Sequence, residues 1–214
     1  PKESPSYGTI LSILENKDKI PHISLIGDLY YNYWTDDVNV RGILRRTSLL
    51  SYKSSTPKWE IVLDIDKLCN IENESWVYKG YTIYKPDDKN IPVTRCLMKL
   101  SRGGADATVV REFDLITKSF VLPTSTNGCD GNSSKSNSNL QQCGFVIPEA
   151  KSFVSWKDEN TLLIGTDMHD GLSMTDSGYP RTVREWKRGT LLSESKLIME
   201  CQNNDMLISG FVSR

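Results

Sequence analysis

The chain has 214 residues, enough for one large domain or for one and a half small ones. Its 26 basic and 27 acidic side chains nearly cancel, which argues against a nucleic acid or an anionic membrane surface as the main partner, because both attract a clustered basic excess. No run of about 18 apolar residues is present, and the polar N-terminus, PKESPSYG, lacks the apolar core of a signal peptide, so we predict a cytoplasmic protein without a transmembrane segment.

Only the first part of the chain has a helical pattern. In TILSILENKDKIP, apolar side chains recur at Ile10, Leu11, Ile13 and Leu14, and Pro21 is expected to end the helix. We therefore predict a short helical lead-in within residues 1–20.

From residue 21 onward the pattern changes to short runs rich in β-branched and aromatic residues, separated by Gly, Asn, Asp and Ser turns. No amphipathic helical segment of about 10–15 residues lies between these runs, so they predict a mainly β protein. The expected strands or hairpin arms are, in chain order, LIGDLYYNYWTD, VRGILRRTSL, WEIVLDID, WVYKGYTIY, TRCLMKLSR, TVVREFDL, KSFVLP, SFVSWKDENTLLIGTD, TVREWKRG and SKLIMEC.

Residues 124–142 form the segment with the strongest loop character. They are rich in Ser, Asn and Gly and show no apolar periodicity, and we predict a low-complexity surface loop. The loop separates FVLP from GFVIPEAKSFVSW, which we interpret as the closing and opening strands of adjacent repeat units.

The cysteines are scattered, without a CxxC motif or a histidine at ligand spacing. Their odd number favours free thiols in a reducing compartment. One alternative stays open, because Cys129 and Cys143 bracket most of the low-complexity run and would close it as a disulfide if oxidised. The five positions are Cys69, Cys96, Cys129, Cys143 and Cys201.

An internal repeat is the most informative pattern in the chain. Three pairs of β runs, each joined by a short polar turn, share a charged pair near the end of the first run; they begin at ILRRTSL, VVREFDL and TVREWKRG. Aligning Leu44, Val110 and Val183 gives intervals longer than a usual propeller blade of about 40–50 residues, so we expect a shorter underlying unit. Repeats of this kind stack around an axis, and the pattern favours a β-propeller over a β-sandwich.

The residue patterns that could carry chemistry are weak. The Gly103–Gly104 loop of LSRGGADATVVREFDL fits neither GxxxxGK[ST] nor GxGxxG, and we interpret it as a turn between strands, with Arg111, Glu112 and Asp114 on the strand that follows. No GxSxG pentapeptide is present for a serine nucleophile, and a triad within this chain would need His169, since the other histidine, His22, is expected to be structural.

Two acidic groups remain as candidates. In TDMHDG, Asp167, His169 and Asp170 could bind a hard metal ion, although no second ligand cluster supports them and a polar loop is the better interpretation. In LDID, Asp64 and Asp66 would lie on one side of a strand, where acid–base work is less expected than acceptance of turn amides. We predict no catalytic, cofactor-binding or metal-binding residue in this chain and no cofactor. The tryptophans are expected to pack between blades rather than bind sugars or bases; they are Trp34, Trp59, Trp76, Trp156 and Trp186.

The same residues resemble the propeller domain of the prolyl oligopeptidase family of serine peptidases. The resemblance runs from about residue 20 to residue 200, and SRGGADATVVREFDL is its most specific block; the Ser/Asn insert and a shortened approach to TDSGYP depart from the family pattern. The other segments that carry it are WTDDVNVRGILRRTSLLSY, WEIVLDIDKL, WVYKGY, GFVIPEAKSFVSWKDENTLLIGTD and LSMTDSGYPRTVREWKRGT.

The resemblance implies a seven-bladed propeller that caps an α/β-hydrolase domain, admits short proline-containing peptides and excludes folded proteins. Residues 21–214 would supply about three four-stranded blades, and the hydrolase domain with its catalytic triad would be absent, so this chain alone is expected to be inactive. Its partners would be that hydrolase domain and short peptides. The alternative is a non-catalytic partial propeller, or the remnant of a truncated peptidase gene, that associates with itself through open blade edges.

Overall fold

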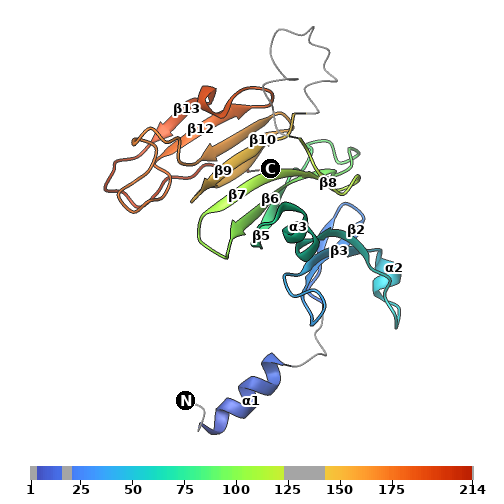
Figure 1. Ribbon diagram of the computed structural model, residues 1–214. Coiled ribbons are helices and arrows are strands. Elements are labelled where there is room, and N and C mark those ends of the chain that lie inside the picture. The colour runs from blue at the N-terminus through green and yellow to red at the C-terminus, as the bar shows by residue number, and fades with distance from the viewer. Residues whose placement is uncertain (1–3, 16–20, 123–142, 214) are drawn as a thin grey trace. The chain divides into compact units, whose positions relative to one another are not determined.

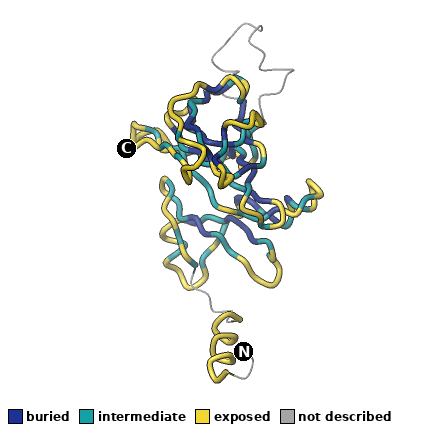
Figure 2. The backbone as a smooth tube through the Cα atoms, turned by 90° about the vertical axis from the view of Figure 1, so that its left-hand side faces the viewer, coloured by how far each residue is buried: buried dark blue, intermediate teal, exposed yellow. Residues whose placement is uncertain are grey.

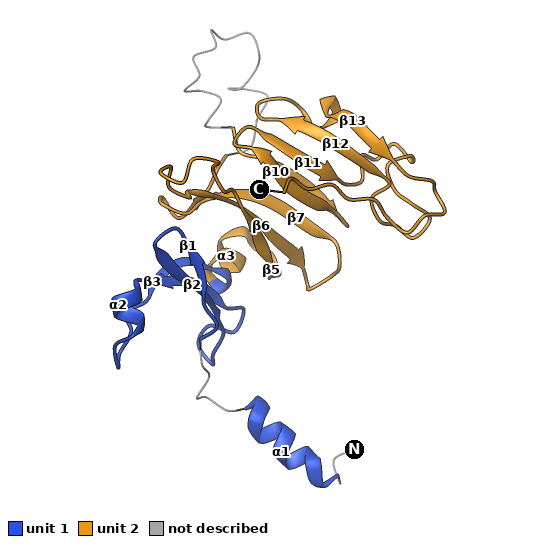
Figure 3. Ribbon diagram, turned by 180° about the vertical axis from the view of Figure 1, so that it is seen from behind, with its two compact units in different colours: residues 1–66 blue, residues 67–214 orange. Residues whose placement is uncertain are grey.

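The computed structural model describes residues 4–15, 21–122 and 143–213, and Figure 1 labels its elements. The predicted mainly β architecture is confirmed, because three antiparallel sheets follow one another along the chain. The chain divides into two compact units, residues 1–66 and residues 67–214 (Figure 3). The first unit holds the first sheet, and the second unit holds the other two.

The N-terminal helix α1 covers Pro5–Leu14 and therefore begins before the TILSIL stretch that indicated it. Pro5 occupies the start of the helix, where its fixed φ fits and no amide donor is needed. None of its residues is buried, and Ile13 and Leu14 are among its exposed apolar side chains.

The first sheet has four antiparallel strands that neighbour one another in chain order. Two short helices missed by the sequence patterns belong to its connections. Helix α2 (Leu49–Tyr52) starts at Ser48, whose hydroxyl accepts a hydrogen bond from the Ser51 amide, and helix α3 (Ile65–Glu72) follows the last strand directly. The strands are β1 (Ser24–Ile26), β2 (Leu29–Trp34), β3 (Ile43–Thr47) and β4 (Glu60–Asp64).

The second sheet begins the second unit and contains five strands. The outer edge of β7 is shared by two short strands: β8 pairs with its C-terminal end and β9 with its N-terminal half. The low-complexity residues predicted as a surface loop lie between β8 and β9, outside the described residues. The strands are β5 (Trp76–Ile83), β6 (Arg95–Arg102), β7 (Thr108–Asp114), β8 (Ser119–Phe120) and β9 (Val146–Ala150).

The pairing of β9 corrects one expectation. We had interpreted GFVIPEAKSFVSW as the opening of the next repeat unit, whereas the VIPEA part closes the second sheet and the third sheet opens only at Phe153. Pro148 lies within β9, and its missing amide is tolerated because β9 is an edge strand.

The third sheet again has four antiparallel strands in chain order, and the 3-10 turn η1 (Leu192–Glu194) lies between the last two. The hairpin predicted from SFVSWKDENTLLIGTD is confirmed as its first two strands. The strands are β10 (Phe153–Asp158), β11 (Thr161–Gly165), β12 (Thr182–Lys187) and β13 (Lys196–Glu200).

The repeat alignment is confirmed in position. Leu44, Val110 and Val183 all lie on the third strand of their sheet, β3, β7 and β12. Each interval therefore runs from one blade to the next and includes the connections, whereas the first and third blades themselves, residues 24–64 and 153–200, have the expected length of about 40–50 residues. The connections account for the extra length, above all the 166–181 loop and the segment between β8 and β9.

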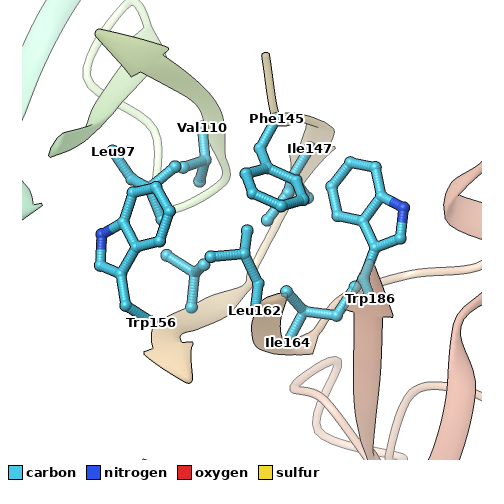
Figure 4. Close-up of a cluster of buried hydrophobic side chains, with 9 residues drawn as sticks. Leu97, Val110, Phe145, Ile147, Trp156, Leu162, Ile164 and Trp186 are labelled. Atoms are coloured by element: carbon cyan, nitrogen blue, oxygen red, sulfur yellow. The ribbon is translucent and has the colours of Figure 1, made fainter. Parts of the chain in front are cut away.

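A buried hydrophobic cluster lies between the second and third blades. Phe145 sits between two indoles, with ring centroids 5.9 Å from Trp156 and 4.9 Å from Trp186 (Figure 4). Figure 2 colours the backbone by burial, and the residues of this cluster are among the buried ones. The cluster comprises Leu97, Val110, Phe145, Ile147, Val154, Trp156, Leu162, Ile164 and Trp186.

Candidate functional site

The glycine pair that opened the search for a phosphate loop is a turn between β6 and β7. Gly103 and Gly104 have φ values of 60° and 89°, in the region that favours glycine. The Gly103 amide donates to the Ser75 carbonyl at 2.8 Å, which holds the turn against the start of β5. The interpretation as a blade turn is confirmed.

The charged residues of the following strand face three different environments. Arg111 donates to both carboxylate oxygens of Glu72 on α3, at 2.8 and 3.0 Å. Asp114 accepts the amides of Ile116 and Thr117 in the next turn. Glu112 points to the opposite face from Arg111 and is fully buried between the blades.

Glu112 belongs to a buried ionic cluster whose main cation is Arg188, just after β12. The guanidinium binds the carboxylate in a bidentate manner, with Nη1 to Oε2 at 2.7 Å and Nη2 to Oε1 at 3.0 Å. Arg95 approaches Oε1 at 3.3 Å, and the Phe145 amide donates to Oε2 at 3.0 Å. Each carboxylate oxygen therefore has two donors.

The five donors of Arg188 are also all used. Besides Glu112, its guanidinium donates to the carbonyls of Cys143 and Glu159, both at 2.8 Å, and to the Asn160 side chain at 3.0 Å. The guanidinium also lies over the Phe145 ring, 4.5 Å from its centroid. A buried ion pair with every lone pair and proton satisfied holds blades together and leaves no group free for catalysis.

The TDMHDG segment is a loop of locally satisfied side chains. Asp167 accepts the His169 amide at 2.7 Å, and Asp170 accepts the amides of Leu172 and Ser173, both at 2.9 Å. The Leu172 amide is the main cause that lowers the pKa of Asp170. Within the described ranges, no three His, Cys, Asp or Glu side chains come together as metal ligands.

The LDID pair is split by the end of a strand. Asp64 is the last residue of β4, whereas Asp66 lies in the first turn of α3, so the expectation of one strand face is wrong. Both carboxylate oxygens of Asp66 accept the Arg41 amide, at 3.1 and 2.9 Å, so Asp66 is an amide acceptor as expected, but for a residue 25 positions earlier rather than for its own turn. His22 is exposed, and its carbonyl accepts the Asn32 side chain at 2.9 Å.

The tryptophans serve two different purposes. Trp156 and Trp186 pack between blades as expected, and Trp156 also donates to the Thr82 carbonyl of β5 at 3.0 Å. In the first unit, Trp34 and Trp59 instead enclose the Arg45 guanidinium, which lies 4.3 Å from each ring centroid. For these two residues, packing between blades stays a prediction, and the contact that the structure shows is with a cation of their own blade.

The cysteines are divided between free thiols and one disulfide. Among the described residues, Cys69, Cys96 and Cys201 are free, whereas Cys143 is disulfide-bonded. Cys129, the partner suggested by the sequence, lies outside the described residues, so that pairing stays a prediction. Burial, with smaller contributions from the nearby acidic side chains, raises the pKa of the Cys96 thiol well above its usual range.

One cavity of about 470 Å³ opens at an end of the second and third blades. Four separate connections supply its wall: the β6–β7 turn, the β9–β10 link, the β11–β12 loop and the segment after β13. We call it the rim cavity; its wall includes Asp106, Lys151, Ser152, Phe153, Tyr179 and Ile208.

Sequence patterns did not identify Arg188 or the rim cavity. Arg188 follows its strand like any surface residue, and its partner Glu112 lies 76 positions away. The TDSGYP stretch, which contributes Tyr179 to the cavity, was conspicuous only through family resemblance.

No helix in the described part of the chain is long and apolar enough to cross a membrane.

The curated relatives that this chain resembles are named as peptidases. No family model matches the chain. An uncharacterized peptidase from Sinorhizobium fredii is 34% identical over 207 residues, covering 96% of this chain and 25% of the relative. An uncharacterized peptidase from Rickettsia prowazekii is 28% identical over 182 residues, covering 84% of this chain and 22% of the relative. The chain thus spans about a quarter of the length of these curated relatives.

Solved structures show the same fold. A post-proline cleaving enzyme from Rickettsia typhi matches with a TM-score of 0.74 and 25% identity, over 98% of this chain and 28% of that enzyme. Oligopeptidase B from Leishmania major matches with a TM-score of 0.55 and 12% identity, over 88% of this chain and 22% of that structure.

Three consecutive antiparallel blades define the chain as a partial β-propeller. The peptidase relatives and the match of nearly the whole chain to part of the post-proline cleaving enzyme make the chain similar to the propeller part of prolyl oligopeptidase family peptidases. The resemblance seen in the sequence is confirmed.

Proposed function

We propose that this chain is the substrate-gating propeller part of a prolyl oligopeptidase-like serine peptidase that cleaves short proline-containing peptides. The observation that carries the proposal is the match over 98% of the chain to a post-proline cleaving enzyme. The catalytic serine, histidine and aspartate would belong to an α/β-hydrolase domain, the partner of this propeller part.

The gating role has a steric basis. Blades packed around an axis enclose a narrow channel, and a folded protein cannot enter a passage that admits a single extended chain. The gate works only if substrates cannot pass between neighbouring blades and must use the narrow central channel. The joint between the second and third blades meets this requirement through the aromatic cluster and the buried pair of Glu112 and Arg188.

The first test separates gating from catalysis. The 214-residue chain alone is expected to leave a Gly-Pro chromogenic peptide uncut, because its sequence has no GxSxG nucleophile motif. Turnover by the chain that a serine-directed inhibitor abolishes would contradict this assignment.

The second test uses the complete peptidase that carries this propeller part. It should cut a Gly-Pro bond in a short peptide and spare the same bond on the surface of a folded protein. An Arg188→Met substitution, which loosens the joint between blades, should raise cleavage of the larger substrate relative to the small one, whereas Lys187→Met, at an exposed neighbouring position, should not. Equal cleavage of folded and short substrates by the unaltered enzyme would refute the gate.

A second candidate function is a non-catalytic interaction module. The supporting observation is β13, in which every residue is exposed and Leu197, Ile198 and Met199 are apolar. An edge of this kind favours association with another strand. Under this alternative the 214-residue chain self-associates in sedimentation experiments and Ile198→Lys weakens the association; a monomer at every accessible concentration counts against it.

A further inference from the structure

The rim cavity is lined by two charged side chains without an ionic partner. Lys151 lies over the Tyr179 ring, 4.5 Å from its centroid, and neither it nor Asp106 forms an ion pair within the described ranges. An ammonium group without a carboxylate partner, at the wall of a cavity, is an arrangement that a bound anionic group completes.

The rest of the wall is apolar or aromatic. Phe153 and Ile208 line it together with the Tyr179 ring, and the Ile208 amide donates to the Pro180 carbonyl at 3.0 Å, which fixes the segment after β13 against the β11–β12 loop. A volume of about 470 Å³ falls in the range of small-molecule sites. The cavity thus offers a cation, an anion and an apolar surface within one small space.

We infer that the rim cavity binds the terminus of a short peptide with an apolar or prolyl last residue. The ligand carboxylate would accept from the Lys151 ammonium. Its apolar ring would pack on Tyr179 and Phe153, and its ammonium group, in a dipeptide, would face Asp106. The choice of a peptide rests on the proposed function, and the inference deepens it by naming a peptide-binding site on the propeller itself.

The probe is the dipeptide Ala-Pro, titrated into the ¹⁵N-labelled 214-residue chain and followed by NMR. The amides of Lys151, Ser152, Phe153 and Tyr179 are expected to shift together with a single dissociation constant. Lys151→Met should weaken binding about tenfold or more, since it removes a hydrogen bond between two charged groups. Lys151→Arg should stay close to the unaltered chain.

Matched ligands and a matched variant make the test specific. Ala-Pro amide, which lacks the carboxylate, should bind as weakly as Ala-Pro binds to Lys151→Met, and N-acetyl-Ala-Pro should lose the contribution of Asp106. Lys187→Met, an exposed substitution outside the cavity, should leave the affinity unchanged. Equal binding of Ala-Pro and its amide, or no shifts in these four amides, overturns the inference.

This binding measurement needs no catalysis. Ala-Pro binding by a chain whose complete protein cuts no prolyl peptide would leave the cavity assignment standing and remove the proposed function. Post-proline cleavage without Ala-Pro binding would do the reverse.

Discussion

Arg188 of the third blade and Glu112 of the second form a bidentate ion pair in which both side chains are almost completely removed from solvent, with 4% and 0% exposed. The pair also fixes residues 143–145, just before β9, because the Cys143 carbonyl accepts from Arg188 and the Phe145 amide donates to Glu112. One pair of side chains therefore joins two blades and an otherwise irregular segment.

Removing one member of this pair should be strongly destabilising. Arg188→Met leaves the Glu112 carboxylate buried with only Arg95 nearby, and we expect the free energy of unfolding to fall by about 3–5 kcal/mol. Urea unfolding followed by tryptophan fluorescence measures the change. The double variant Arg188→Met with Glu112→Leu should recover part of the loss, because it removes the uncompensated charge.

The matched control is the ion pair of Lys157 and Glu185 on the third blade, where the Lys157 side chain is 45% exposed. Lys157→Met should lower the free energy of unfolding far less than Arg188→Met, because solvent screens the exposed pair. If Arg188→Met and Lys157→Met unfold at the same urea concentration, the buried pair does not hold the blades as described.

Cys96 should be the least reactive of the free thiols. It is fully buried on β6, and burial, followed by the nearby carboxylates of Glu112 and Asp114, raises the pKa of its thiol, so almost no thiolate forms near neutral pH. Alkylation with iodoacetamide and mass spectrometry of the folded chain should label Cys69 and Cys201 well before Cys96. Labelling of all three thiols at the same rate in the folded chain would contradict the burial of Cys96.

Asp36 should make the free energy of unfolding of the first unit depend on pH in the acidic range. The Asn39 amide and the Trp34 indole donate to its carboxylate and lower the pKa of Asp36 to about 2. Because the folded pKa lies below the ordinary value, the stabilisation is complete above about pH 4 and is lost as the pH falls toward 2. The difference in unfolding free energy between the unaltered chain and Asp36→Ala should shrink over that window, and a carbon-detected NMR titration should place the Asp36 midpoint near 2. A constant difference would contradict the hydrogen-bonded turn.

Chelation should leave the protein unchanged. Asp167 and Asp170 already accept amides of their own loop, so their oxygens serve the backbone conformation. EDTA is expected to cause no shift in the melting temperature, whereas Asp170→Ala should cost about 1 kcal/mol through the lost turn acceptor. A melting temperature that falls with EDTA and recovers with a divalent cation would instead support the metal interpretation of TDMHDG.

The sequence patterns were informative wherever the signal was local. Alternating β-branched residues located the strands, and the alignment of Leu44, Val110 and Val183 found the third strand of every blade. Helix α3 was missed because LDID continues the strand pattern, and the partner of Asp66, the Arg41 amide, lies 25 residues earlier. Strand β9 was assigned to the wrong blade because its partner β7 lies on the far side of the low-complexity run.

The candidate sites were harder to predict because their residues also lie far apart in the sequence. The rim cavity needs four connections to converge, and the buried pair needs two strands from different blades; neither produces a pattern in a short window of sequence. The Gly103–Gly104 turn, by contrast, depends on backbone freedom at two adjacent residues and was identified correctly.

The joint between the blades also has a direction. Glu112 projects from the face of the second blade that meets the third, while Arg188 projects from the third blade back toward the second. The two surfaces differ, so the contact is heterologous: the front of one blade fits the back of its successor, and two fronts cannot pair around a two-fold axis. Units joined by such a contact add in one sense only; they close into a ring when the rotation at successive joints sums to a full turn, and otherwise they leave an open edge at each end.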